Sequence, residues 1–149
     1  MIKKAESFHF IESKLLNLYK VKGKMKKIIQ IPNAPAPIGP YSQAVVKGKI
    51  LYVSGQIPLC PMEGELRCGT IQEATNQVLT NIKVLVETAG FTMDDVVKCS
   101  IFLKNMDDFA AVNAVYETYF SEMPPARETV QVSKLPLDVP VEISCIAQR

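Results

Sequence analysis

Arg127 and Glu142 are the two residues whose types and spacing could do chemistry. Arg127 follows Pro124-Pro125-Ala126 and opens a strand-like stretch, and Glu142 stands fifteen positions later in another. Prolines restrict the backbone before the arginine, so the guanidinium is held on a stiff segment. A rigid guanidinium can bind a carboxylate through two parallel hydrogen bonds. The pair predicts either a site that binds and transforms a small acid, or a structural ion pair.

The elements that must position these residues follow the order β-β-β-α-β-α-β-β. A capping box at Thr70 and Glu73 opens the first helix, which Gly90 ends. Asp107 is predicted to cap the second helix, and Pro124-Pro125 to stop it. The buried side of this helix is expected to be Phe109, Val112, Tyr116, Tyr119 and Phe120. Two helices spaced in this way can cover one face of a single sheet, so we expect an α+β fold. The expected strands are residues 26–31, 44–46, 50–54, 95–103, 127–133 and 141–147.

Alternation within the last two strands predicts which face each side chain occupies. Val141 and Ile143 fall on one side with Glu142 on the other, and Val130 opposes Arg127. The apolar side should meet the helices, which places both Arg127 and Glu142 on the helix-free face. The strand at 95–103 carries bulky apolar residues on both sides, so that face should be partly apolar. Another subunit is expected to cover it, with the site at the interface.

Composition is that of one globular domain, with 149 residues, 48% apolar and 21% charged. Residues 1–24 are predicted to be an extension of unassigned role and residues 25–149 the domain. Residues 1–29 carry eight Lys and two Glu, whereas residues 30–149 carry nine basic and thirteen acidic residues. A mildly acidic body argues against nucleic-acid binding, and no apolar run is long enough to span a bilayer. We expect a cytoplasmic protein, or a mitochondrial or plastid one if residues 1–24 are a targeting segment.

The four cysteines form no C-x-x-C pair, and the only histidine is His9. That spacing predicts free thiols and no zinc site.

Five stretches together resemble one family. They are 38–44 (Ile-Gly-Pro-Tyr-Ser-Gln-Ala), 52–58 (Tyr-Val-Ser-Gly-Gln-Ile-Pro), 108–114 (Asp-Phe-Ala-Ala-Val-Asn-Ala), and 124–127 (Pro-Pro-Ala-Arg) together with 141–143 (Val-Glu-Ile). From about residue 25 onward the chain resembles the RidA family, also called YjgF. The resemblance implies a chorismate-mutase-like fold and a homotrimer whose sheets form an inner barrel, with three sites at the subunit clefts. It also implies hydrolysis of 2-aminoacrylate and 2-aminocrotonate, or their imine tautomers, to 2-keto acids and ammonia without metal or cofactor.

The resemblance also implies residue roles. Arg127 would bind the substrate carboxylate, and Glu142 would orient a water or transfer a proton. Thr129 stands where many deaminating members of the family carry Cys, which puts a thiol role at that position in doubt. The substrate-binding set that the resemblance implies is Tyr41, Ser54, Gly55, Asn113 and Thr129. For Tyr41, Asn113 and the Ser54-Gly55 pair, a packing or turn-forming role remains the alternative.

Two other functions compete with deamination. RNA cleavage or translation inhibition is also associated with the family, but metal-free cleavage usually needs a histidine, and residues 25–149 have none. A non-catalytic module that binds small acids or a protein partner could use the same cleft.

Overall fold

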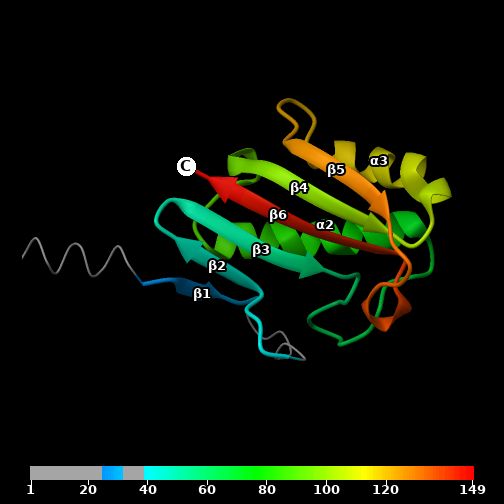
Figure 1. Cartoon of the computed structure of the whole chain (residues 1–149), viewed down its shortest axis with the longest axis horizontal. Helices are drawn as coiled ribbons and strands as arrows, with labels where there is room; N and C mark the ends of the chain where they lie inside the picture. Colours follow the sequence, from blue (N-terminus) through cyan, green and yellow to red (C-terminus); the bar gives the residue numbers. More distant parts are fainter. Residues whose placement is uncertain (1–24, 32–38) are drawn as a thin grey trace, which may run out of the picture.

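The computed structural model describes residues 25–31 and 39–149, which form one six-stranded sheet with two helices packed on one face (Figure 1). The strand order is β1-β2-β3-β6-β4-β5. The predicted α+β class and element order are confirmed. The elements are β1 Lys27–Ile29, β2 Ala44–Lys47, β3 Ile50–Gln56, α2 Ile71–Thr88, β4 Val96–Leu103, α3 Phe109–Glu117, β5 Ala126–Gln131 and β6 Val141–Gln148.

Helix α2 forms as its sequence predicts. The Thr70 hydroxyl accepts from the Glu73 N–H, and the Glu73 carboxylate accepts from the Thr70 N–H. Its apolar stripe is fully buried against β3 and β6, and each large side chain so buried contributes about 1.5–3 kcal/mol. Gly90 follows with φ +83°, a conformation that stops the helix at low cost. This helix fixes the core on which the sheet rests.

The start of α3 differs from the prediction. Asp107 belongs to a short 3-10 turn, Met106–Asp108, which Asn105 caps by accepting from the Asp107 N–H. Asp108 is the residue before α3, and its side chain makes no capping bond. Phe109, predicted to be buried, is 37% exposed. Its ring lies beside the guanidinium of Arg127 on β5.

The face assignment of Arg127 is wrong, whereas that of Glu142 is correct. Strand β5 pairs with β4 in parallel, and Arg127 lies opposite Cys99, which in turn lies opposite the buried Cys145. Arg127 therefore lies on the helix-covered face. Glu142 lies opposite Phe102, on the other face. The parallel pairing of the edge strand β5 with β4 determines which face Arg127 occupies. The prediction assumed that Val130 faces the helices, but Val130 lies on the helix-free face.

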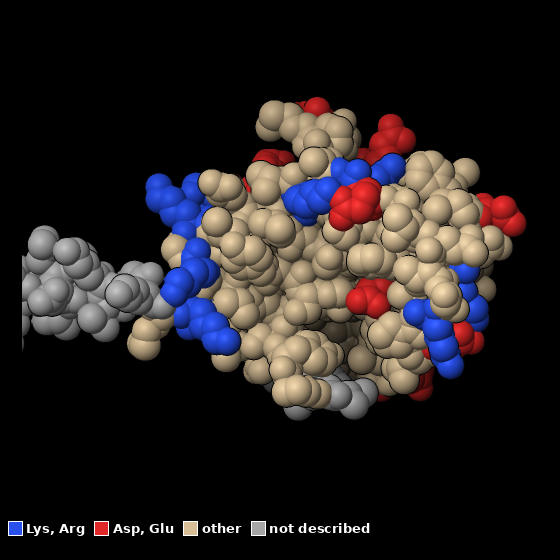
Figure 2. All heavy atoms as spheres, in the orientation of Figure 1, with Lys and Arg blue, Asp and Glu red and all other residues tan. Residues whose placement is uncertain are grey.

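The helix-free face is broad, largely uncharged at its centre and partly apolar, as predicted (Figure 2). Ile28, Tyr52 and Val130 are 53%, 46% and 42% exposed on it. Lys98 forms an ion pair with Glu128 toward the β5 edge. An apolar sheet face of this kind is a surface that a partner usually covers.

The loop between β3 and α2 contains a single β-bridge, between Leu59 and Leu66. The predicted extension at 1–24, and most of the proline-rich connection at 32–40, lie outside the described residues. No helix within the described ranges is long and apolar enough to cross a bilayer.

Candidate active site

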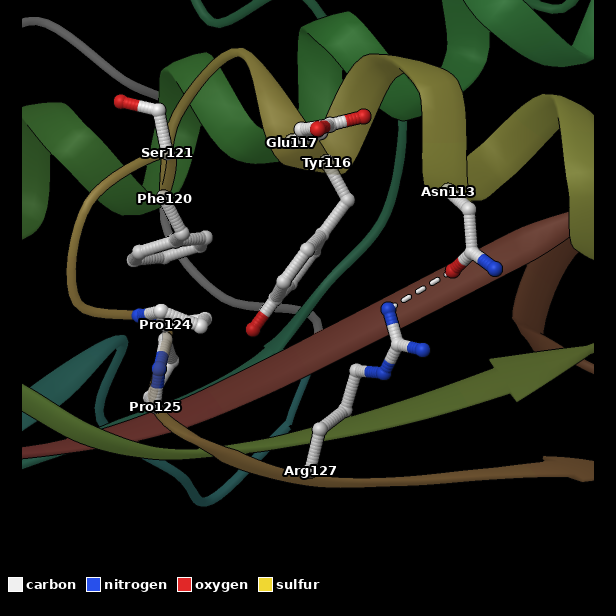
Figure 3. A pocket seen from close by; sticks show the side chains of 8 residues that line it. All are labelled: Asn113, Tyr116, Glu117, Phe120, Ser121, Pro124, Pro125 and Arg127. Atoms are coloured by element: carbon white, nitrogen blue, oxygen red, sulfur yellow. Dashed lines mark hydrogen bonds between the residues drawn. The ribbon is translucent and has the colours of Figure 1, made fainter.

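Arg127 reaches from β5 toward Asn113 and Tyr116 of α3 (Figure 3), and Phe109 of the same helix also lies beside it. Its Nη1 donates a 2.7 Å hydrogen bond to the Asn113 Oδ1. Its guanidinium carbon lies 4.9 Å from the ring centroid of Tyr116 and 5.6 Å from that of Phe109, which are cation–π distances. We call Arg127, Asn113, Phe109 and Tyr116 the arginine cluster.

Helical spacing explains why α3 supplies all three partners. Phe109, Asn113 and Tyr116 are separated by four and three residues, so they share one face of the helix. Burial raises the pKa of the Tyr116 hydroxyl above its ordinary value, which keeps it protonated at neutral pH. An open hollow lies beside the cluster, lined by Asn113, Tyr116, Glu117, Phe120, Ser121, Pro124, Pro125 and Arg127.

The bond to Asn113 leaves most of the donors of Arg127 available. A guanidinium carries five N–H groups, and within the described ranges only the one at Nη1 makes a hydrogen bond. Asn113 and the two rings fix its orientation, and the remaining edge can bind a carboxylate in bidentate fashion. The arginine cluster therefore has the geometry and charge to bind an anion.

Glu142 lies in a second hollow, on the other face of the sheet. Its carboxyl is half-buried, and burial raises its pKa above the usual glutamate range. No hydrogen bond or ion pair involves this carboxylate in the part of the chain that the structure describes. The hollow is lined by Tyr41, Ser54, Gly55, Ile57, Pro136, Leu137 and Glu142, which we call the carboxylate cluster.

Gly55 makes room for the Glu142 side chain. A Cβ on Gly55 would lie 1.7 Å from Glu142 Oε1 and 2.7 Å from its Cδ, far inside any possible contact. The close packing of these two residues, and not an unusual backbone angle, is the reason for glycine here. Any larger residue at position 55 would displace the carboxylate.

The other predicted residues of this hollow have different roles. The Ser54 hydroxyl donates to the Ser42 carbonyl over 2.7 Å, so it ties β3 to the segment before β2. Tyr41 is 55% exposed at the rim. Asn81, which the sequence did not single out, is buried on α2 and donates to the carbonyls of Ile57 and Leu59. It fixes the loop that forms one wall of the hollow.

Thr129 lies on the face of Arg127, opposite Ile101 of β4. Its hydroxyl oxygen is enclosed, and among the described residues it has no hydrogen-bond partner. Thr129 lines neither hollow. Its hydroxyl is not open to solvent in the single chain, so its substrate-binding role stays a prediction.

The predicted site residues thus divide between the two faces of the sheet. Arg127, Asn113 and Thr129 lie on the helix-covered face, and Tyr41, Ser54, Gly55 and Glu142 around the hollow on the other. The intrachain ion pair weighed from sequence is therefore not formed. One chain therefore carries an arginine with available donors on one face of the sheet and a carboxylate with a raised pKa on the other.

All four cysteines, which lie within the described ranges, are free thiols, as predicted. Burial raises the pKa of Cys99 and Cys145, which face each other across β4 and β6. Within the described ranges no group of three or more His, Cys, Asp or Glu side chains could hold a metal ion.

Comparison with known sequences gives a consistent assignment. The family model described as Endoribonuclease L-PSP matches residues 31–149. A RutC family protein of Pyrococcus horikoshii is 51% identical over 125 residues, covering 84% of this chain and 99% of that protein. The 2-iminobutanoate/2-iminopropanoate deaminase of Escherichia coli K12 is 47% identical over 128 residues, covering 84% and 99%.

Solved structures show the same fold. A structure of a putative endoribonuclease from Thermotoga maritima has a TM-score of 0.81 at 50% identity and covers 84% of this chain and 98% of its own. A structure of E. coli TdcF with bound serine has a TM-score of 0.78 at 42% identity, covering 83% and 98%.

Proposed function

Because this chain belongs to the RidA (YjgF) family, we propose that it hydrolyses reactive 2-imino acids to 2-keto acids and ammonia. The observation that carries the proposal is the pair of clusters, one fitted to a carboxylate and the other presenting a carboxyl of raised pKa. Its 47% identity to a relative named 2-iminobutanoate/2-iminopropanoate deaminase supports the same chemistry.

The reaction needs a binding group and one group that moves a proton. Arg127 binds the substrate carboxylate and so fixes the position of the adjacent imine carbon. Glu142 in its ionised form accepts a proton from a water molecule as the water oxygen bonds to that carbon. Glu142 returns this proton to the nitrogen, which gives a carbinolamine. The proton of the new hydroxyl is then transferred to the nitrogen as the C–N bond breaks, so that ammonia leaves and the carbonyl of the 2-keto acid forms. An imine carbon is already electrophilic, so positioning and proton transfer through one carboxyl are enough.

We propose that the site is completed between subunits of a homotrimer. Arg127 and Glu142 lie on opposite faces of the sheet in one chain, and the helix-free face exposes Ile28, Tyr52 and Val130. Packing of sheet faces around a threefold axis would cover these side chains. It would also allow Arg127 of one subunit to approach Glu142 of the next.

The remaining predicted residues then have supporting roles. Asn113 orients the guanidinium, and Gly55 leaves space for the Glu142 carboxylate. Ser54 holds the strand end, because its hydroxyl donates to the Ser42 carbonyl and its N–H donates to the Gln43 carbonyl. Tyr41 lines the rim, and Thr129 contacts substrate only if assembly or binding opens its enclosed hydroxyl.

A coupled assay with mixed subunits tests chemistry and assembly together. A threonine dehydratase supplies 2-aminocrotonate, and 2-ketobutyrate release is followed with the native chain, with Arg127→Ala and with Glu142→Ala. Each variant alone should be inactive. Subunits of the two variants, mixed one to one, unfolded and refolded together, should recover activity, because about a quarter of the sites would combine an intact Arg127 with an intact Glu142.

The outcomes separate the parts of the proposal. No recovery, in mixtures shown by mass spectrometry to contain both chains, would place the whole site within one subunit. No acceleration by the native chain would reject deamination of this substrate and favour the small-acid-binding module. RNA cleavage by the native chain that persists in both variants would assign the activity of the family model's description to a different site.

A further inference from the structure

Leu137 is a large apolar side chain held out from the fold on an unfavourable backbone. It has φ 53° and ψ 19°, and Asp138 follows with φ 58°. Asp tolerates the left-handed region, whereas a bulky residue such as leucine rarely adopts it. Backbone of this kind persists only where the surrounding structure enforces it, and it concentrates at functional sites.

The surrounding structure enforces this turn from both sides. Leu135 and Val139 flank it, and both are buried. The Asp138 N–H donates to the Leu135 carbonyl over 3.1 Å. The Asp138 carboxylate accepts from Lys104 Nζ over 2.8 Å, which ties the turn to the end of β4. These contacts therefore hold the turn in a fixed conformation.

Leu137 is the exposed residue of this turn, at 58% exposure between the buried Leu135 and Val139. The side chain lines the same hollow as Glu142 and Gly55. Ile57 and Pro136 add apolar surface to the same wall. A reacting carboxylate thus stands beside an apolar wall within one hollow.

We propose that Leu137 determines substrate specificity by contacting the side chain of the substrate. The inference rests on the proposed function, in which Arg127 binds the carboxylate and Glu142 acts at the imine carbon. The side chain of a 2-imino acid is attached to that carbon, so it must lie close to Glu142. Leu137 then favours imino acids with longer apolar side chains over the smallest one.

The test compares two ligands that differ by one methylene group. The ratio of kcat/KM for 2-aminocrotonate to that for 2-aminoacrylate is measured for the native chain and for Leu137→Ala. The ratio of Kd values for the products, 2-ketobutyrate and pyruvate, is measured by titration in the absence of turnover. Leu137→Ala should reduce the preference for the longer ligand by about fivefold, less than an enclosed pocket would give because the leucine is half exposed.

Two matched variants complete the design. Leu137→Met keeps an apolar side chain of similar length and should retain the preference. Leu66→Ala removes an exposed leucine in the loop after β3, outside this hollow, and should leave both ratios unchanged. Light scattering reports the assembly state of each variant.

Each result decides the inference. The inference is overturned if the preference for the longer ligand is unchanged in Leu137→Ala, whether or not the assembly dissociates. It is also overturned if Leu66→Ala changes this preference equally, or if neither keto acid binds. If the native chain shows no turnover but Leu137→Ala lowers the Kd ratio as expected, the contact of Leu137 with the ligand is supported and deamination is rejected. If the native chain turns over normally and neither ratio changes in Leu137→Ala, deamination is supported and the role of Leu137 is rejected.

Discussion

The arginine and carboxylate clusters occupy opposite faces of one sheet and are built differently. Arg127 is bound by Asn113 and flanked by two rings, so its own chain fixes its geometry. Glu142 has no such partner in the described chain, stands against Gly55 and has a pKa raised by burial. A group that binds must be fixed before the ligand arrives, whereas a group that transfers a proton needs a suitable pKa and room for water. Under the proposed function, binding belongs to one face of the sheet and proton transfer to the other.

The largest expected effect comes from Glu142→Gln, which keeps the shape and removes the base. We expect kcat to fall by about 10²–10⁴-fold, with product affinity changed by less than about twofold. Steady-state kinetics and titration with 2-ketobutyrate give the two quantities, and Glu87→Gln on the exposed side of α2 is the control. A loss confined to KM would mean that Glu142 binds and does not react.

Arg127→Lys tests the other side of the comparison. Lysine keeps the charge but loses the planar fork, so KM should rise by about tenfold to a hundredfold while kcat changes less. The measurement is initial rate against substrate concentration, with Arg67→Lys in the loop after β3 as the control. An unchanged KM would show that charge alone suffices and that the orientation imposed by Asn113 is irrelevant.

The pH dependence of kcat reports Glu142 in the substrate complex, where the substrate carboxylate neutralises the charge of Arg127. Glu142 must be ionised to accept a proton, so kcat should fall about tenfold per pH unit below its pKa. Because burial raises that pKa, the decline should begin at higher pH than for an ordinary glutamate. A decline at or below the ordinary range would show that burial is not the dominant influence in the complex.

Gly55→Ala should displace the Glu142 carboxylate without removing it. We expect kcat to fall by about tenfold to a hundredfold, as for an ångström-scale misplacement of a catalytic group, with KM nearly constant. Gly39→Ala is the matched control, since a Cβ there would meet only Tyr41 at 3.6 Å. A variant as active as the native chain would mean that the carboxylate can act from a second position.

Asn113→Ala should have the smallest effect, a rise in KM of about threefold, because the two rings still hold the guanidinium. Asn113→Asp should raise KM further, since a fixed negative charge beside Arg127 competes with the substrate carboxylate. Asn76→Ala on α2 serves as the control. An effect of Asn113→Ala on kcat alone would place this side chain at the reaction instead.

The element order was predictable because local signals and burial agreed. The Thr70 and Glu73 capping box, the stripe of α2 and the final Gly90 all favoured one structure, and it formed. The face of Arg127 was not predictable from its own strand. It depends on the parallel register with β4, which pairing across the sheet decides and local alternation does not.

Several site residues could have been found and others could not. Once Asn113 was placed in the site, helical spacing required Phe109 and Tyr116 to be there too, although the sequence assigned both to the core. Leu137 gave no comparable signal, since a leucine with positive φ runs against the preference of its residue type. In the sequence Asn81 is one polar residue within a helix. Its role in fixing the loop after β3 follows only from its hydrogen bonds to the carbonyls of Ile57 and Leu59.

The placement of the two clusters on opposite faces has a consequence for cells that make little of this protein. If each working site needs two chains, a newly made chain is inert until it meets another. Activity at low abundance would then rise more steeply than in proportion to the amount of protein made. Under the proposed function and assembly, halving gene dosage would cost more than half of the activity, and dilution of a purified sample would lower the activity per chain without unfolding a single subunit.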